Sequence, residues 1–226
     1  MSMIGFRILE REQPAIPAET LRRFSEIGSA QISDCMNRLY GVVGLRPQHA
    51  STAARMVGLA LTVKTRPGDN LLIHKAISMG LPGDVIVVDG GGETGNALVG
   101  ELMAMDAQRR GIVGFVIDGA VRDVDVFQSG AFACYARGVS HRGPYKDGPG
   151  EVNVPVSVGG QVVFPGDVII GDADGVVVVP AGHAEAVLEA ASRKEQAEAG
   201  IKEKISNGTY SKPWVDETIA ARREGK

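Results

Sequence analysis

The stretch "VIVVDGGGETGNALVGELMAMDAQRRGIVGFVIDGAVRD", residues 85–123, decides the fold of this chain. It begins and ends with apolar, β-branched runs typical of buried strands, and part of the segment between them has a helical pattern. The expected order is strand 85–89, loop 90–99, helix 100–110, strand 113–118, turn 119–121 and then Arg122-Asp123. A strand–helix–strand unit of this length makes two parallel neighbouring strands joined by a right-handed crossover. We therefore predict an α/β fold with a parallel crossover.

The crossover brings chemically active groups to one edge of the sheet, because the C-terminal ends of parallel strands lie together. The start of the predicted helix, Gly100 to Met103 with Leu102 between them, offers free backbone amides to a carboxylate or phosphate. Arg122 carries a planar guanidinium that binds a carboxylate through two hydrogen bonds. The sequence thus predicts a crevice for a small anion.

Two carboxylates, Glu101 and Asp123, are expected in the same crevice. Carboxylate oxygens suit Mg²⁺ and Mn²⁺, which keep several water ligands and need only one or two protein carboxylates. A purely structural interpretation is also open: Glu101 is favourable in the first turn of any helix. Arg122 and Asp123 would then form a solvent-exposed ion pair on a turn. The spacing alone does not choose between the two.

The glycines of "VIVVDGGGETG", residues 85–95, raise a nucleotide-binding loop as a competing hypothesis. Their order does not follow G-x-G-x-x-G in the expected frame, and no acidic residue closes a second strand where a ribose contact requires one. The four histidines show no metal-ligand spacing. Neither cysteine lies in a C-x-x-C motif, and no serine sits in a nucleophile elbow. These alternatives are weaker than the crevice at Arg122-Asp123.

Composition restricts the class of protein further. The 226 residues carry a net charge of -3, with a pI of about 5.8, which does not indicate a nucleic-acid-binding face. Two isolated cysteines, Cys35 and Cys134, suit reduced thiols. The N-terminus lacks the pattern of a signal peptide, and no apolar run approaches the roughly 18 residues of a membrane span. We expect a cytoplasmic protein that binds neither membrane nor nucleic acid.

We expect a single domain over residues 1–226, arranged in three zones. Residues 18–40 read as two short helices, residues 42–180 as a strand-rich core, and the segment from Ala181 to about Ser206 as a long charged helix. A polar tail follows, in which Trp214 stands beside a proline. That tail is a candidate interface element.

The segment from 83 to 127, "GDVIVVDGGGETGNALVGELMAMDAQRRGIVGFVIDGAVRDVDVF", resembles the RraA-like family. The stretches "DNLLIHKA", "ARGVSHRGP" and "PGDVIIGDADGVVVVP" and the charged C-terminal helix also resemble family sequences. The family includes class II 4-hydroxy-4-methyl-2-oxoglutarate / 4-carboxy-4-hydroxy-2-oxoadipate aldolases, regulators of ribonuclease E, and members long labelled demethylmenaquinone methyltransferases. The resemblance implies a layered β/β/α core with N-terminal helices and a long C-terminal helix.

The aldolases of the family carry an acidic residue, twenty intervening positions and then Arg-Asp, and this sequence fits that spacing. Glu101 stands where the aldolases usually have aspartate, which keeps the charge and shifts the carboxylate. By resemblance, Asp123 ligates Mg²⁺ or Mn²⁺ directly and Glu101 holds a metal-bound water. Arg122 and the backbone amides around Leu102 and Met103 bind the pyruvyl end of the substrate. A glutamate from a neighbouring subunit completes the family site.

The best matches for that glutamate are Glu195 and Glu198 on the C-terminal helix, and the sequence does not choose between them. The resemblance implies homotrimers or homohexamers with sites between subunits. It also implies a lyase that cleaves a 4-hydroxy-2-oxo acid to pyruvate and a second oxo acid, and that decarboxylates oxaloacetate through the same enolate. The alternative is a non-catalytic protein-binding regulator of the ribonuclease E type. The Arg-Asp pair favours the enzyme.

Overall fold

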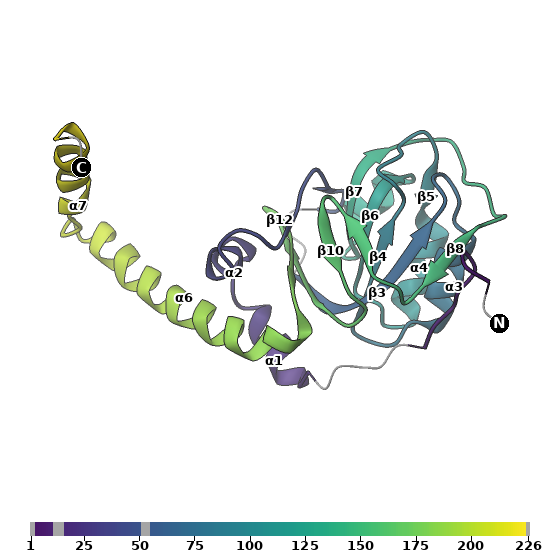
Figure 1. The fold of residues 1–226 in the computed structure, drawn as a ribbon, viewed down its shortest axis with the longest axis horizontal. Helices are drawn as coiled ribbons and strands as arrows, with labels where there is room; N and C mark the ends of the chain where they lie inside the picture. The colour runs from purple at the N-terminus through teal and green to yellow at the C-terminus, as the bar shows by residue number, and fades with distance from the viewer. Residues whose placement is uncertain (1–2, 11–15, 51–54, 225–226) are drawn as a thin grey trace.

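A large mixed sheet forms the centre of the protein in the computed structural model, which describes residues 3–10, 16–50 and 55–224 (Figure 1). Its strands follow the order β1-β12-β11-β3-β4-β6-β7-β2, with β5 paired to β6 and β8 paired to β3. Their bounds are β1 Gly41–Val42, β2 Arg46–Pro47, β3 Met56–Thr65, β4 Asp84–Asp89, β5 Ala97–Val99, β6 Gly114–Val121, β7 Ala133–Val139, β8 Gly150–Val152, β11 Val168–Asp172 and β12 Gly175–Val179.

The middle of the sheet is parallel, and the edges are antiparallel. Strands β3, β4, β6 and β7 pair in parallel, whereas β11, β12, β8, β1 and β2 pair antiparallel. Nearly every residue of β4 and β6 is buried, as expected for parallel strands covered on both faces. The predicted crossover between these two neighbours is confirmed.

Two local predictions within the crossover were wrong. Residues 119–121 are not a turn, because β6 continues to Val121 and its last residues pair with β5 and β7. The expected loop 90–99 ends in the short strand β5, which lies beside the far end of β6. Three residues are too few to give a periodic signal in the sequence. The extension moves Arg122 directly to the end of a strand.

Helices cover the sheet in two groups (Figure 1). The core helices are α3 Leu71–Met79, α4 Glu101–Arg109 and α5 Val124–Ser129. The remaining helices are α1 Ala18–Phe24, α2 Ser29–Cys35, α6 Ala184–Ser206 and α7 Pro213–Arg223, with a short 3-10 turn, η1 Ala181–His183, before α6. None of the helices in the described ranges is both long and apolar enough to cross a membrane.

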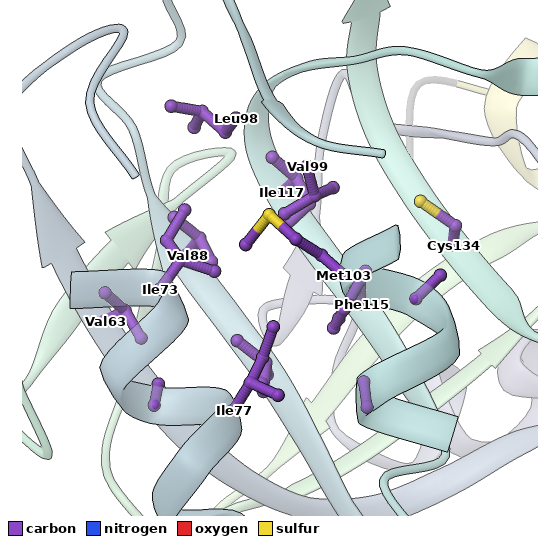
Figure 2. Packing of buried hydrophobic residues seen from close by; sticks show 14 of the residues in the cluster. Val63, Ile73, Ile77, Val88, Leu98, Val99, Met103, Phe115, Ile117 and Cys134 are labelled. Atoms are coloured by element: carbon purple, nitrogen blue, oxygen red, sulfur yellow. The ribbon is translucent and has the colours of Figure 1, made fainter. Parts of the chain in front are cut away.

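The core has one hydrophobic cluster on each face of the parallel strands. In Figure 2, Ile73 and Ile77 from α3 and Met103 from α4 point toward residues of the sheet that include Phe115 and Ile117. A second cluster forms between the opposite face and a hairpin of β9 Val156–Val158 and β10 Gln161–Val163. The predicted β/β/α layering is therefore confirmed.

The C-terminal helix leaves the body of the molecule. The first part of α6 packs against α1, α2 and the β11–β12 end of the sheet through Leu188 and Ala191, and the rest projects outward (Figure 1). The tail was predicted only as a polar segment with no assigned helix; residues 213–223 form α7, in which no residue is buried. Trp214 on α7 is 60% exposed. Its role in an interface stays a prediction.

The N-terminal segment is held to β8 by an ion pair. Arg7 donates to both carboxylate oxygens of Glu151 at 2.7 Å, and the Gly5 amide donates to the same carboxylate at 2.8 Å. The Arg7 guanidinium and the Gly5 amide hold the pKa of Glu151 at about 2, below its ordinary value of 4.5, although burial acts in the opposite direction.

We therefore predict that Glu151 stabilises the fold at neutral pH and that this contribution is lost under acid conditions. A carboxyl group with a lowered pKa in the folded state contributes fully above its unfolded value, near 4.5, and loses that contribution as the pH falls toward about 2. Thermal unfolding between pH 7 and pH 2 should show a shallower pH dependence for Glu151→Gln than for the wild type. Glu203→Gln, an exposed position on α6, should behave as the wild type.

Candidate active site

The end of β6 presents Arg122 and Asp123 in an unusual backbone conformation. The Arg122 amide donates to the carbonyl oxygen of Val99 at 3.0 Å, which ties the end of β6 to β5. Asp123 then adopts the left-handed region, with φ 57° and ψ 42°, immediately before α5. Aspartate is among the few residues other than glycine that tolerate this region. The turn aims the Asp123 side chain at the start of α4.

Asp123 caps α4 from a different element. Its Oδ2 accepts a hydrogen bond from the Glu101 amide at 3.0 Å and lies 3.6 Å from Arg122 Nε. A carboxylate is favoured at this position because the helix N-terminus carries partial positive charge. Gly100 permits the contact, since a Cβ atom there would lie 2.4 Å from Asp123 Oδ2.

Several polar groups around this contact remain available to a ligand. Within the described ranges, the amides of Leu102 and Met103, at the first turn of α4, have no acceptor. The Oδ1 atom of Asp123 and the carboxylate of Glu101 likewise have no partner among the described residues. Arg122 Nε lies 3.6 Å from Asp123 Oδ2, and the two terminal nitrogens of Arg122 form no hydrogen bond with the described residues. Both donors for an anion and acceptors for a cation are therefore present.

These groups meet at a pocket with a volume of about 110 Å³. Of the predicted site residues, those that line it are Gly100, Leu102, Met103, Arg122 and Asp123. Glu101 does not line the pocket directly, but its amide is bonded to Asp123 at the rim. The fold therefore brings together the end of β6 and the start of α4, as the crossover predicted.

Seven further residues line the pocket: Asn70, His74, Ala97, Leu98, Val99, Pro144 and Lys146. None of them was among the predicted site residues. Asn70 and His74 are four residues apart at the start of α3, so they share one face of that helix. This spacing was a usable signal within "DNLLIHKA". No sequence pattern around Lys146 indicates that it lies at the pocket, because Lys146 stands in the loop between β7 and β8, outside the crossover.

That loop is fixed by the buried carboxylate of Asp69. Its Oδ2 accepts the amides of Asp147 at 2.7 Å and Gly148 at 2.9 Å, and its Oδ1 accepts the Leu71 amide at 3.0 Å. The Asn70 amide also donates to the carbonyl oxygen of Tyr145 at 3.0 Å. These bonds hold the loop against the start of α3 and position the exposed Lys146 at the pocket.

On the α3 side of the pocket, the ionisable lining residues are His74 and Lys146. Partial burial lowers the pKa of His74, and the nearby Lys146 ammonium acts in the same direction, while the Asp106 carboxylate opposes them. The lowered pKa of His74 favours the neutral imidazole at neutral pH. Lys146 and Arg122 remain as the two cations around the pocket.

The carboxylates suit a hard divalent cation. The described residues contain no group of three or more His, Cys, Asp or Glu side chains that could enclose a metal ion. Asp123 Oδ1 and the Glu101 carboxylate offer two oxygen donors, and Mg²⁺ commonly takes only one or two protein carboxylates with water in its other positions. The donor set thus fits Mg²⁺ or Mn²⁺ better than zinc, which prefers nitrogen and sulfur ligands.

The two candidate glutamates of the C-terminal helix lie outside the pocket of their own chain. Glu198 accepts a hydrogen bond from Gln31 of α2 at 2.7 Å and lies 3.8 Å from Lys194. Neither Glu195 nor Glu198 is among the residues that line the pocket, and α6 projects away from α4 (Figure 1). Their predicted role concerns a neighbouring subunit and stays a prediction.

Residues 29–178 match the family model described as Aldolase/RraA. The chain belongs to the RraA-like family. It is 38% identical over 192 residues to a protein of Halalkalibacterium halodurans named "Putative 4-hydroxy-4-methyl-2-oxoglutarate aldolase", covering 84% of this chain and 90% of that protein. Two further relatives, from Ectopseudomonas mendocina and Thermus thermophilus, carry the same name, and these names support a lyase.

Solved structures agree with the fold. An uncharacterized protein from Pseudomonas syringae superposes with a TM-score of 0.78 at 31% identity, covering 86% of this chain and 96% of that one. The RNA-processing inhibitor RraA from Thermus thermophilus gives a TM-score of 0.62 at 30% identity, covering 68% and 92%. The predicted RraA-like fold is confirmed, and proteins of this fold carry more than one name.

We predict that Gly100→Ala disrupts the site while the fold persists. The added Cβ would lie 2.4 Å from Asp123 Oδ2 and 2.9 Å from Arg122 Cγ, so one of these side chains must move. Displacing a carboxylate from its position should weaken Mn²⁺ binding about tenfold or more, measured by electron paramagnetic resonance.

The matched control is Gly182→Ala, because no atom lies within 4 Å of a Cβ built at Gly182. It should leave both Mn²⁺ affinity and melting temperature unchanged. Unaltered Mn²⁺ affinity in Gly100→Ala would show that the Asp123 carboxylate is not part of a metal site.

Proposed function

We propose that this protein is a divalent-metal-dependent class II aldolase that cleaves a 4-hydroxy-2-oxo acid to pyruvate and a second oxo acid. The observation that carries the proposal is the convergence of Arg122, Asp123 and the free amides of α4 on one small pocket. The pocket therefore combines hydrogen-bond donors for a carboxylate with carboxylate oxygens that can ligate a cation.

The size of the pocket supports a small substrate. A volume of about 110 Å³ accommodates the pyruvyl part of a 2-oxo acid. Pockets for larger organic ligands span roughly 300–1,000 Å³, so a nucleotide or S-adenosylmethionine would not be enclosed here. The positive charges of Arg122 and Lys146 match an anionic substrate.

Each group of the chain has a role in carbon–carbon bond cleavage. The amides of Leu102 and Met103 bind the substrate carboxylate, as helix N-termini do. Arg122 donates to the keto oxygen, where negative charge develops as the bond between C3 and C4 breaks and its electron pair forms the pyruvate enolate. A water held at Glu101 receives the C4 hydroxyl proton. Protonation of the enolate then yields pyruvate.

Asp123 would hold Mg²⁺ or Mn²⁺ through Oδ1, while its Oδ2 keeps the bond to the Glu101 amide. The bound ion would act as a Lewis acid that polarises the keto group. We also propose that a neighbouring subunit of a homotrimer or homohexamer contributes Glu195 or Glu198 to this site. Among the described residues of one chain, no group of three or more His, Cys, Asp or Glu side chains could enclose a metal ion, so an open site here leaves positions for a further ligand from a neighbouring subunit.

Oxaloacetate decarboxylation follows from the same arrangement. Loss of carbon dioxide from oxaloacetate leaves the enolate of pyruvate, the species that Arg122 is positioned to stabilise. No hydroxyl proton needs to be removed in that reaction. We therefore propose that one pocket performs both reactions.

A protein-binding regulator is the second candidate, because the RNA-processing inhibitor RraA from Thermus thermophilus shares this fold. A binding surface gives no reason for a left-handed aspartate that caps a helix beside a free guanidinium. Strained residues cluster at sites where chemistry requires their placement. This observation favours the enzyme.

Pyruvate release coupled to lactate dehydrogenase tests the proposal. The wild type should turn over both 4-hydroxy-4-methyl-2-oxoglutarate and oxaloacetate with Mg²⁺, and EDTA should abolish both activities. Arg122→Ala should lower kcat/KM about 10²–10³-fold, the usual effect of removing one donor to a developing oxyanion. Arg122→Lys keeps the charge but loses the planar fork, and should recover only part of the activity.

The fold should survive these substitutions, since the Arg122 side chain is 45% exposed and forms no other ion pair with described residues. Arg142→Ala, an exposed arginine that does not line the pocket, is the matched control. Turnover that is independent of both metal and Arg122 would refute the proposed mechanism. A folded wild type that turns over neither substrate would favour the regulator.

Glu101→Asp and Glu101→Gln test the acidic residue. Aspartate restores the residue usual in the related aldolases, so Glu101→Asp should keep activity within about tenfold of the wild type. Glu101→Gln removes the charge and should lower kcat about 10²-fold or more, as expected for loss of a group that assists proton transfer. Equal activity of Glu101→Gln and the wild type would exclude a role for the Glu101 carboxylate.

A further inference from the structure

Lys146 is a cation at the pocket that has no counter-ion in the described chain. The residue is exposed and lines the pocket together with Arg122. No hydrogen bond or ion pair joins its ammonium group to the residues that the structure describes. Burial and, next, the Lys146 ammonium lower the pKa of His74, another lining residue, so the charge of Lys146 acts inside the pocket.

The backbone on both sides of Lys146 is fixed. Before it, the Tyr145 amide donates to the carbonyl oxygen of Gly68 at 2.8 Å. After it, the Asp147 amide donates to the Asp69 carboxylate at 2.7 Å. Lys146 therefore starts from a preset backbone position, and only its side chain loses freedom when an anion binds.

The Asp69 carboxylate that holds this loop is a fully buried charge. The residue is 0% exposed, and a carboxylate is costly to bury unless hydrogen bonds satisfy it. Its donors are the amides of Leu71, Asp147 and Gly148 and, at 3.1 Å, the Arg66 guanidinium. The position of the loop against α3 is thus built into the fold.

The other donors of the pocket are assigned to the pyruvyl end of the substrate. In the proposed function the amides of Leu102 and Met103 bind the first carboxylate, and Arg122 donates to the keto oxygen. The pyruvyl part occupies a pocket of about 110 Å³, so the rest of the substrate extends toward solvent. Lys146, an exposed residue, is the remaining cation among the described lining residues. The inference rests on the proposed function and concerns the end of the substrate away from the pyruvyl unit.

We propose that Lys146 binds a second carboxylate at the far end of the substrate and selects 4-hydroxy-2-oxo dicarboxylic acids over 4-hydroxy-2-oxo acids with an uncharged end. An ammonium on a flexible stem is a compact point charge, so it binds a carboxylate without requiring one fixed geometry. An uncharged end gains nothing from this charge, and specificity is the difference between the two affinities. The second carboxylate takes no part in bond cleavage, so Lys146 acts on substrate binding and not on the enolate.

The pair 2-oxoglutarate and 2-oxopentanoate tests the proposal by binding alone. The two compounds have equal chain lengths and the same 2-oxo acid end, and they differ in a terminal carboxylate or methyl group. With Mg²⁺ present, the wild type should bind 2-oxoglutarate about tenfold more tightly or better, measured by isothermal titration calorimetry, as expected for a hydrogen bond between charged groups. The preference should shrink as the salt concentration rises, because the ammonium is exposed. Equal affinities in the wild type would overturn the proposal.

Lys146→Met removes the charge and keeps most of the apolar stem. It should weaken 2-oxoglutarate binding about tenfold and leave 2-oxopentanoate binding within about threefold, so that the preference disappears. Lys146→Arg keeps the charge and should keep the preference. Lys75→Met is the matched control, because Lys75 is exposed on α3 and does not line the pocket. A preference that survives in Lys146→Met would belong to another group and would also overturn the proposal.

Turnover separates substrate recognition from catalysis. Lys146→Met should raise KM for 4-hydroxy-2-oxoglutarate about tenfold or more, with kcat within about threefold of the wild type. Turnover of 4-hydroxy-2-oxopentanoate and exchange of the pyruvate methyl protons with deuterium oxide should both stay within about threefold, because neither compound has a second carboxylate. Loss of pyruvate exchange in Lys146→Met would mean that Lys146 acts on the enolate, which contradicts the proposal.

These outcomes are distinct from failure of the proposed function. Each contradicting result leaves cleavage and pyruvate exchange by the wild type intact. A folded wild type that, supplied with Mg²⁺, neither releases pyruvate from 4-hydroxy-2-oxoglutarate nor exchanges the protons of pyruvate would instead refute the aldolase itself.

Discussion

The parallel pairing of β4 with β6 is the constraint on which the site depends. It forces the chain to cross the sheet through α4, and so brings the start of α4 back to the end of β6. The additional pairing of β5 with β6 fixes the last residues before Gly100 against the strand that ends at Val121. Arg122 and Asp123 therefore cannot move independently of the amides of α4.

The Asp123 carboxylate has both a structural contact and a proposed role in binding a cation. Its Oδ2 satisfies an amide of the α4 N-terminus, while its Oδ1 faces no partner in the described chain. The left-handed backbone that makes this possible is tolerated by aspartate and asparagine but costs more for most other residues. The same residue would thus stabilise the helix and hold a cation, and Gly100 provides the space for it.

The sequence predicted the parts of the fold that rest on long apolar runs. Strands β4 and β6 are buried along nearly their whole length, so the apolar pattern alone predicts both strands, the crossover between them and the meeting of Arg122, Asp123 and Gly100. The end of β6 was placed too early, because Ala120 and Val121 follow a glycine and carry no strand signal without β5 as a partner. Helix α7 was missed because its sequence is polar and none of its residues is buried.

The rest of the pocket depends on contacts between residues distant in the sequence. Lys146 reaches the pocket because Asp69 binds the amides of Asp147 and Gly148, a contact across more than seventy residues. Asn70 joins the start of α3 to β5 by donating from Nδ2 to the carbonyl oxygen of Leu98. Hydrogen bonds of this kind leave no periodic pattern, so the four-residue spacing of Asn70 and His74 was the one sequence signal for the α3 side of the pocket.

Exchange of the methyl protons of pyruvate in deuterium oxide, followed by proton nuclear magnetic resonance, tests the central claim most directly. The exchange requires formation of the pyruvate enolate without any carbon–carbon bond chemistry or second substrate. The account predicts Mg²⁺-dependent exchange by the wild type that is lost in Asp123→Asn, a variant that keeps the left-handed turn and the acceptor for the Glu101 amide. Exchange that proceeds equally in Asp123→Asn, or its absence in the folded, Mg²⁺-supplied wild type, would contradict an enolate site at Arg122 and Asp123.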